Sequence, residues 1–254
     1  GLVMPDRFIP LAEQSGLILA IGHWVIAQAI GDLAQWDTDG LPPVRLAINL
    51  SPAQFRDPTL VEHLRAALAE HRVDPGRVEL ELTETVLMQE HDQAVLIMAQ
   101  LRELGIHLAI DDFGMGYSSL SYLHRFPIDI LKIDRSFIDG LGRTGPDTSI
   151  VRAIVTLADT LGLEVVAEGV ENERQLRLIR QLGCAFGQGF FWSRPLPPDE
   201  ALALLAARTL PKAQVSLFDA RAADRDVSTD ARTLALALGS IQLLERVGAW
   251  DAAR

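Results

Sequence analysis

Cysteine and positive charge are both scarce in this sequence. Its one cysteine, Cys184, cannot form an internal disulfide, and a lone thiol among apolar neighbours is most often a buried core residue. The net charge of −11 argues against a protein that holds long nucleic acid, because such binding depends on clusters of basic side chains. An anionic substrate would therefore have to be bound through metal ions or a few well-placed cations.

Targeting and membrane-spanning signals are also missing from the sequence. We find no signal-peptide pattern and no uninterrupted apolar run long enough to cross a bilayer. We therefore expect a cytoplasmic protein, or the cytoplasmic part of a larger sensory protein, with no membrane contact from this chain itself. Apolar residues are abundant instead: 48% of the 254 residues are hydrophobic, enough for one domain of barrel size with a small extension.

Strand-like and helix-like segments alternate along most of the chain. Apolar residues at helical spacing predict two helices, over residues 5–15 and 21–36, ahead of the first strand. The other expected helices cover residues 60–70, 92–104, 148–161, 172–182 and 198–207, and the expected strands cover residues 44–49, 78–84, 106–110, 128–134, 164–171 and 186–191. Repeated strand and helix units indicate parallel strands covered by helices.

Two α/β architectures fit this alternation, an open doubly wound sheet and a closed (β/α)8 barrel of the TIM type. In an open sheet the site lies at one switch point, so few strands end in reactive groups. Here all six strands end in such groups, namely Asn49, Glu81, Asp111 with Asp112, Lys132, Glu168 and Gln188. No glycine-rich dinucleotide fingerprint follows any strand. The pattern favours the barrel, in which every strand ends at the same mouth.

A closed barrel of this class needs eight strands, and the sequence supplies six. Because two helices precede the first visible strand, we expect the missing strands before Gly1. Residues 1–208 are predicted to form this N-terminally incomplete, modified barrel. Residues 209–254 are predicted to form a polar linker and a C-terminal helical extension, in which an apolar helix over residues 233–250 packs on the barrel or on a partner.

The adjacent acids Asp111 and Asp112 indicate a metal site. Two neighbouring carboxylates repel one another, and a divalent cation allows both to stay ionised. Oxygen donors without cysteine or histidine at metal spacing select hard cations such as Mg²⁺ or Mn²⁺. Two such ions could share one carboxylate, activate a water molecule and stabilise in-line displacement at phosphorus. Lys132 would then orient that water or balance charge on a phosphate oxygen.

Each residue at a strand end also has an ordinary structural explanation. Asp112 could cap a helix, and Asn49 could form a turn. Gln188 could be a hydrogen-bonded core amide, Glu168 a surface acid, and Lys132 a partner in an ion pair. Taken singly, each ordinary explanation is the commoner one. That all of them hold together at successive strand ends is much less common, which favours a shared site.

Several motifs, taken in order, resemble those of the EAL domain family, the cyclic di-GMP phosphodiesterases of bacterial signalling. The resemblance runs from residues 8–13 to residues 195–197. It is carried by Asn49-Leu50-Ser51, Glu81-Leu82-Thr83-Glu84, Asp111-Asp112-Phe113-Gly114, Tyr117-Ser118-Ser119-Leu120, Leu131-Lys132-Ile133-Asp134, Ala167-Glu168-Gly169-Val170-Glu171 and Gln188-Gly189. The motif that names the family is absent and is expected before Gly1, and Met115 stands where the family usually has a smaller residue.

The resemblance implies a modified (β/α)8 barrel that hydrolyses cyclic di-GMP to the linear dinucleotide pGpG with two Mg²⁺ or Mn²⁺ ions. The implied metal ligands are Asn49, Glu81, Asp111, Asp112 and Glu168. Lys132 would orient the attacking water, and Gln188 would make a further polar contact.

Supporting roles and assembly are also implied by the resemblance. Glu84 would hold the loop over residues 112–119 in place, Glu171 would be a supporting acid, and the domain would form a homodimer. The absence of the glutamate of the naming motif leaves a second hypothesis open. In that case the domain is catalytically silent and acts as a cyclic di-GMP receptor or a protein-interaction module.

Overall fold

The computed structural model describes residues 5–39, 43–84, 91–115, 123–142, 146–194, 196 and 201. The polar linker, the C-terminal helix over residues 233–250 and the domain boundary at residue 208 lie outside these residues, as does all but residue 201 of the helix expected over residues 198–207. Two helices, α1 (Pro5–Ser15) and α2 (Leu17–Thr38), begin the described chain. Both were expected, and α2 is a little longer at each end.

Strands and helices alternate after α2, as the sequence predicts. The elements are β1 (Leu46–Leu50), α3 (Pro52–Phe55), α4 (Leu60–His71), η1 (Pro75–Arg77), β2 (Val78–Thr83), α6 (His91–Glu103), β3 (His107–Phe113), β4 (Ile130–Ile133), α8 (Arg135–Asp139), α9 (Asp147–Leu161), β5 (Glu164–Ala167), α10 (Glu173–Leu182) and β6 (Phe186–Gly187). The expected cap is present, since the Asn172 side chain accepts from the Gln175 backbone N–H and opens α10.

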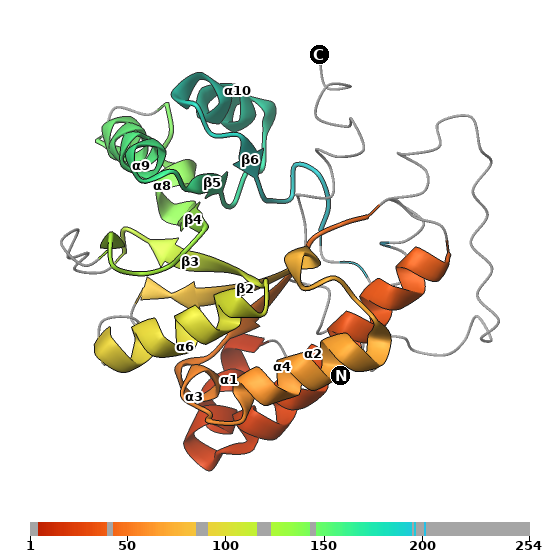
Figure 1. Ribbon diagram of the computed structural model, residues 1–254. Coiled ribbons are helices and arrows are strands. Elements are labelled where there is room, and N and C mark those ends of the chain that lie inside the picture. Colours follow the sequence, from red (N-terminus) through yellow and green to blue (C-terminus); the bar gives the residue numbers. More distant parts are fainter. Residues whose placement is uncertain are drawn as a thin grey trace.

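The described strands form one parallel sheet in the order β1-β2-β3-β4-β5-β6. Strand order follows chain order without the reversal that marks a doubly wound sheet, so the barrel prediction is confirmed for this part of the molecule. The sheet curves, and helices α6, α9 and α10 lie along its outer side (Figure 1). The described residues thus form a half-barrel of six strands.

The two faces of the sheet carry different side chains because successive strand residues point to opposite sides. The outer face, including Leu80, Leu82 and Leu131, packs with the helices into the main hydrophobic core. The inner face holds a second, smaller cluster made of Ala109, Ile130, Val166 and Phe186. Two positions further along the chain from these residues stand Asp111 and Lys132, still within β3 and β4, and Glu168 and Gln188, which directly follow β5 and β6. A small apolar layer therefore supports the polar groups at the carboxyl edge.

Three strand ends differ from the prediction by three residues or more, each for a local reason, and the other strand boundaries lie within two residues of it. The strand expected to end at residue 110 continues to Phe113, because β3 resumes its pairing with β4 after a register shift. The strand expected over 164–171 ends at Ala167, since Gly169 takes a φ of +71°. The strand expected over 186–191 ends at Gly187. The backbone N–H of Phe191 donates to the Val170 carbonyl, and that of Trp192 donates to the Gly189 carbonyl, so the chain turns there.

Helix α2 corrects one expectation about membrane-spanning length. By length and composition this helix is apolar enough to cross a bilayer, although one such helix near the N-terminus is weak evidence. Buried residues of α2, among them Ile26, Ile30 and Leu33, belong to the main core, and the helix packs against α1, α4 and β1. The absence of membrane contact therefore stays a prediction.

Candidate active site

Lys132 lies at the centre of a carboxylate cluster on the inner face of the sheet. Its Nζ atom is 2.6 Å from Glu81 Oε1 and 2.5 Å from Glu168 Oε1, and it is 3.5 Å from Asp111 Oδ1. The side chain is buried, with 3% of its surface exposed. Three acids, from β2, from β3 and from the residue after β5, therefore surround the ammonium group that β4 carries.

Strand register explains how Asn49 and Glu81 join this cluster. Asn49 of β1 lies opposite Glu81 of β2, and Glu81 lies opposite Ala109 of β3. The Asn49 side-chain amide donates to Glu81 Oε2 at 2.7 Å. Both oxygens of Glu81 are therefore engaged in this structure, one by Lys132 and the other by Asn49.

Asp111 and Asp112 contribute to one site although neighbours on a regular strand point to opposite faces. Asp112 adopts a φ of +54°, a left-handed conformation that few residues other than glycine accept, and its backbone N–H donates to Asp111 Oδ1 at 2.9 Å. The β3–β4 register shifts at this point, between Ile110 and Phe113. This local irregularity brings both acids beside Glu168, and one oxygen from each of the three lies within 4.8 Å of the others.

The electrostatics of the cluster follow from burial and from an excess of acid. Burial raises the pKa of Glu81 to about 8 and that of Glu168 to about 7, in both cases against the opposing effect of Lys132. Burial and the nearby Asp111 carboxylate also raise the pKa of Asp112. For Lys132, burial lowers the pKa, but the surrounding carboxylates outweigh it and raise the pKa well above 10.5. One stable ammonium therefore faces more carboxylates than it can neutralise.

Asp111, Asp112 and Glu168 fit a hard divalent cation. All three offer carboxylate oxygens at close spacing, Asp112 is exposed, and the cluster holds excess negative charge that a cation would stabilise. Asn49 and Glu81 lie beside this group and support it through Lys132. Their predicted role as metal ligands stays a prediction.

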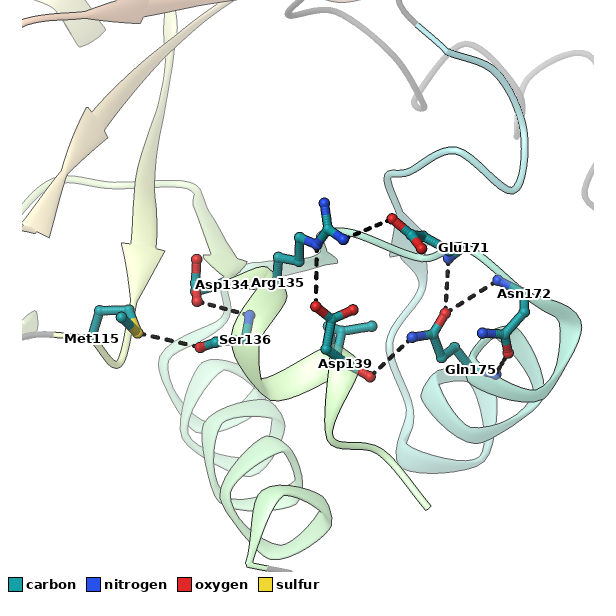
Figure 2. A network of polar contacts seen from close by, with 9 residues as sticks. Met115, Asp134, Arg135, Ser136, Asp139, Glu171, Asn172 and Gln175 are labelled. Carbon is teal, nitrogen blue, oxygen red and sulfur yellow. Dashed lines mark hydrogen bonds and ion pairs between the residues drawn. The ribbon is translucent and has the colours of Figure 1, made fainter. Parts of the chain in front are cut away.

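The remaining candidate residues occupy the loops around the cluster. Glu84 Oε2 accepts from the Gly114 backbone N–H at 3.3 Å, at the beginning of the loop that Glu84 was predicted to hold. Gln188 extends the sheet by a backbone hydrogen bond to the Ala167 carbonyl, and its side chain is half-buried. Glu171 pairs with Arg135 at 2.8 Å (Figure 2). The sequence alone does not single out Arg135, because no local spacing relates it to Glu171.

The family model of the EAL domain matches residues 1–195 of this chain. The chain belongs to the EAL domain family. Among its relatives is the bifunctional diguanylate cyclase/cyclic di-GMP phosphodiesterase MucR of Pseudomonas aeruginosa, 45% identical over 206 residues. That alignment covers 81% of this EAL domain chain and 30% of MucR, so the chain spans about a third of the length of this relative.

Solved structures of EAL domains share the half-barrel. The phosphodiesterase domain of MucR, in complex with c-di-GMP, superimposes with a TM-score of 0.76 at 45% identity, over 79% of this chain and 81% of that one. BlrP1 of Klebsiella pneumoniae, in a complex with manganese and c-di-GMP, gives a TM-score of 0.64 at 34% identity, over 69% of this chain and 44% of that one. The fold expected from the EAL motifs is therefore confirmed.

Proposed function

We propose that this EAL domain is a metal-dependent phosphodiesterase that hydrolyses cyclic di-GMP to the linear dinucleotide pGpG. The observation that carries the proposal is the cluster of Asp111, Asp112 and Glu168 around the buried Lys132. The names of its relatives support the substrate, since MucR is called a cyclic di-GMP phosphodiesterase and a solved structure of it is a complex with c-di-GMP. The manganese in the BlrP1 complex supports a divalent metal.

The residues of this chain divide the work of the proposed reaction. Asp111, Asp112 and Glu168 would hold a Mg²⁺ or Mn²⁺ ion, which would supply Lewis-acid chemistry at the phosphodiester and at a water molecule. Lys132, kept protonated by its carboxylate neighbours, orients the attacking water or holds a phosphate oxygen. Glu81, fixed by the Asn49 amide, keeps the Lys132 ammonium in place.

Other parts of the proposal rest on resemblance to the family. They are a second metal ion with Asn49 and Glu81 among its ligands, a polar contact from Gln188, a homodimer and a cytoplasmic location. Glu84 supports the loop after β3 through its contact with Gly114.

The test uses the protein as its gene encodes it, incubated with cyclic di-GMP and Mn²⁺, followed by chromatographic separation of the nucleotides. We expect pGpG to accumulate and chelation of the metal to stop the reaction. In Ca²⁺, which should support binding better than chemistry, calorimetry is expected to show saturable binding of cyclic di-GMP. Binding of cyclic di-GMP without turnover in Mn²⁺ would contradict the enzyme hypothesis and favour a receptor. An absence of binding would favour a protein-interaction module.

A further inference from the structure

The start of α8, made of its N-cap Asp134 and its first residues Arg135 and Ser136, touches the two loops that carry the acids of the candidate metal cluster. On one side, Ser136 Oγ donates to Met115 Sδ at 3.2 Å, three residues after Asp112. On the other side, Arg135 Nη2 lies 2.8 Å from Glu171 Oε1, three residues after Glu168. Figure 2 shows the start of α8 between the two loops, with Arg135 reaching toward Glu171.

Arg135 also packs directly against the backbone beside Glu168. Gly169 adopts a φ of +71°, and a Cβ atom added there would lie 2.3 Å from Arg135 Cγ. The aliphatic stem of Arg135 therefore occupies the space that any side chain at position 169 would need. One arginine thus meets the segment after β5 twice, at Gly169 through its stem and at Glu171 through its guanidinium group.

The far end of the same segment is anchored to α8 by independent contacts. Gln175 Oε1 accepts from the backbone N–H groups of Glu171 and Asn172, at 2.8 and 3.1 Å. The other end of the same amide, Gln175 Nε2, donates to the buried Ile138 carbonyl of α8 at 3.3 Å. Asp139 of α8 lies 3.2 Å from Arg135 Nε and orients the guanidinium group. These contacts fix the Glu171 backbone on one side of the ion pair and the Arg135 guanidinium on the other.

We infer that Arg135 is a positioning residue that holds residues 168–171 so that the Glu168 carboxylate stays beside Lys132, Asp111 and Asp112. This inference rests on the proposed function and names a further residue that its site requires. Arg135 and Glu171 are both exposed, with side chains 52% and 39% accessible. Exposed ion pairs contribute little to the stability of the fold, so the consequence of losing this one falls on the geometry of the site.

The test compares Arg135→Ala with the wild-type chain by titration with Mn²⁺ alone, and by cleavage of cyclic di-GMP. Loss of a group that orients a metal ligand typically weakens metal binding about 10–100-fold, and we expect Mn²⁺ affinity to fall by at least about tenfold. The rate constant kcat is expected to fall in parallel, with little change in the melting temperature. Arg135→Lys, which keeps the charge and most of the stem, is expected to recover part of the lost affinity.

Arg177→Ala is the control, because Arg177 forms an exposed pair with Glu173 on α10 at 3.0 Å, away from the acids of the candidate metal cluster. Glu171→Gln removes the acceptor of the proposed contact and should weaken Mn²⁺ binding as Arg135→Ala does, while the double variant should lose no more than either single one. Equal Mn²⁺ affinity in Arg135→Ala and Arg177→Ala would overturn the inference. So would a lower melting temperature of Arg135→Ala with an unchanged Mn²⁺ affinity, because that result would show a purely structural role. If the wild-type protein binds Mn²⁺ but does not cleave cyclic di-GMP, the proposed function fails while the metal titration still decides the role of Arg135.

Discussion

Replacing Lys132 by methionine tests the electrostatic account of the site most sharply. Methionine has a similar length and no charge, so the change leaves Glu81, Glu168 and Asp111 without their shared cation. Removing one partner of a buried ion pair typically costs about 3–5 kcal/mol of folding free energy, because the other charge remains buried without compensation. Here the carboxylates can instead take up protons, so the loss should depend on pH.

The sign of that dependence follows from the raised pKa values of the acids. An acid whose pKa is raised by folding lowers the stability of the fold as the pH rises from its unfolded pKa, 4.5 for glutamate, to its folded pKa. In the wild-type protein this loss ends at about pH 7 for Glu168 and about pH 8 for Glu81. Without the ammonium group both folded pKa values rise further, so the variant continues to lose stability above these values.

The magnitude can be estimated for the interval from pH 7 to pH 9. Each pH unit changes the free energy of unfolding by about 1.4 kcal/mol per group. Glu168 contributes at most two units and Glu81 at most one unit, so the additional loss in Lys132→Met relative to the wild type is at most about 4 kcal/mol. Lys132 itself adds no pH dependence here, because its pKa stays above this interval.

The assay is guanidinium unfolding in the presence of a chelator, at pH 7 and at pH 9, for the wild type and for Lys132→Met. Arg177→Met, which removes an exposed cation, is the control and should show the same small effect at both pH values. A stability difference between Lys132→Met and the wild type that is equal at pH 7 and pH 9 would refute the reasoning.

Three smaller predictions follow from single residues. Gly169→Ala should lower the free energy of unfolding by about 1–3 kcal/mol, because alanine is strained at a φ of +71°, and an unchanged unfolding midpoint would contradict this. Asn172→Ala should cost about 1 kcal/mol through loss of the α10 cap; thermal unfolding checks it, and an unaltered melting temperature would count against the cap. Burial raises the pKa of the Cys184 thiol to about 12, so a disulfide reagent at pH 8 should react slowly until guanidinium is added, and prompt reaction of the folded protein would show that the thiol is accessible.

Much of this site was predictable from the sequence, because side chains alternate between the two faces of a sheet and parallel strands all end at the same edge. Once the strands were assigned, their shared direction placed Lys132 and Glu168 at one edge of the sheet, and the structure brings them together. The alternation of faces also accounts for Glu81, which lies on the inner face with Glu79. The EAL motifs then added the family, because their order is more specific than any one of them.

The features that could not be predicted depend on local irregularity or on distant contacts. On a regular strand the side chains of Asp111 and Asp112 would point to opposite faces of the sheet. The left-handed φ of Asp112 brings them to one site, and the only hint of this conformation in the sequence is that aspartate tolerates it better than most residues. The apolar residues Phe190 and Phe191 suggested a longer strand, but the chain turns there and bonds back to Val170. Arg135 lies in an unremarkable position on α8, and its importance comes from a contact with a segment beyond α9.

The central claim is that the acids beside Lys132 hold a metal ion that serves phosphodiester cleavage. The most direct measurement is the rate of cyclic di-GMP cleavage in Mn²⁺ by the wild type, by Asp111→Asn and by the exposed control Asp159→Asn. The account predicts that Asp159→Asn cleaves as the wild type does, and that Asp111→Asn loses at least the roughly 10–100-fold typical of residues that support a metal. Cleavage by Asp111→Asn at the wild-type rate would contradict it.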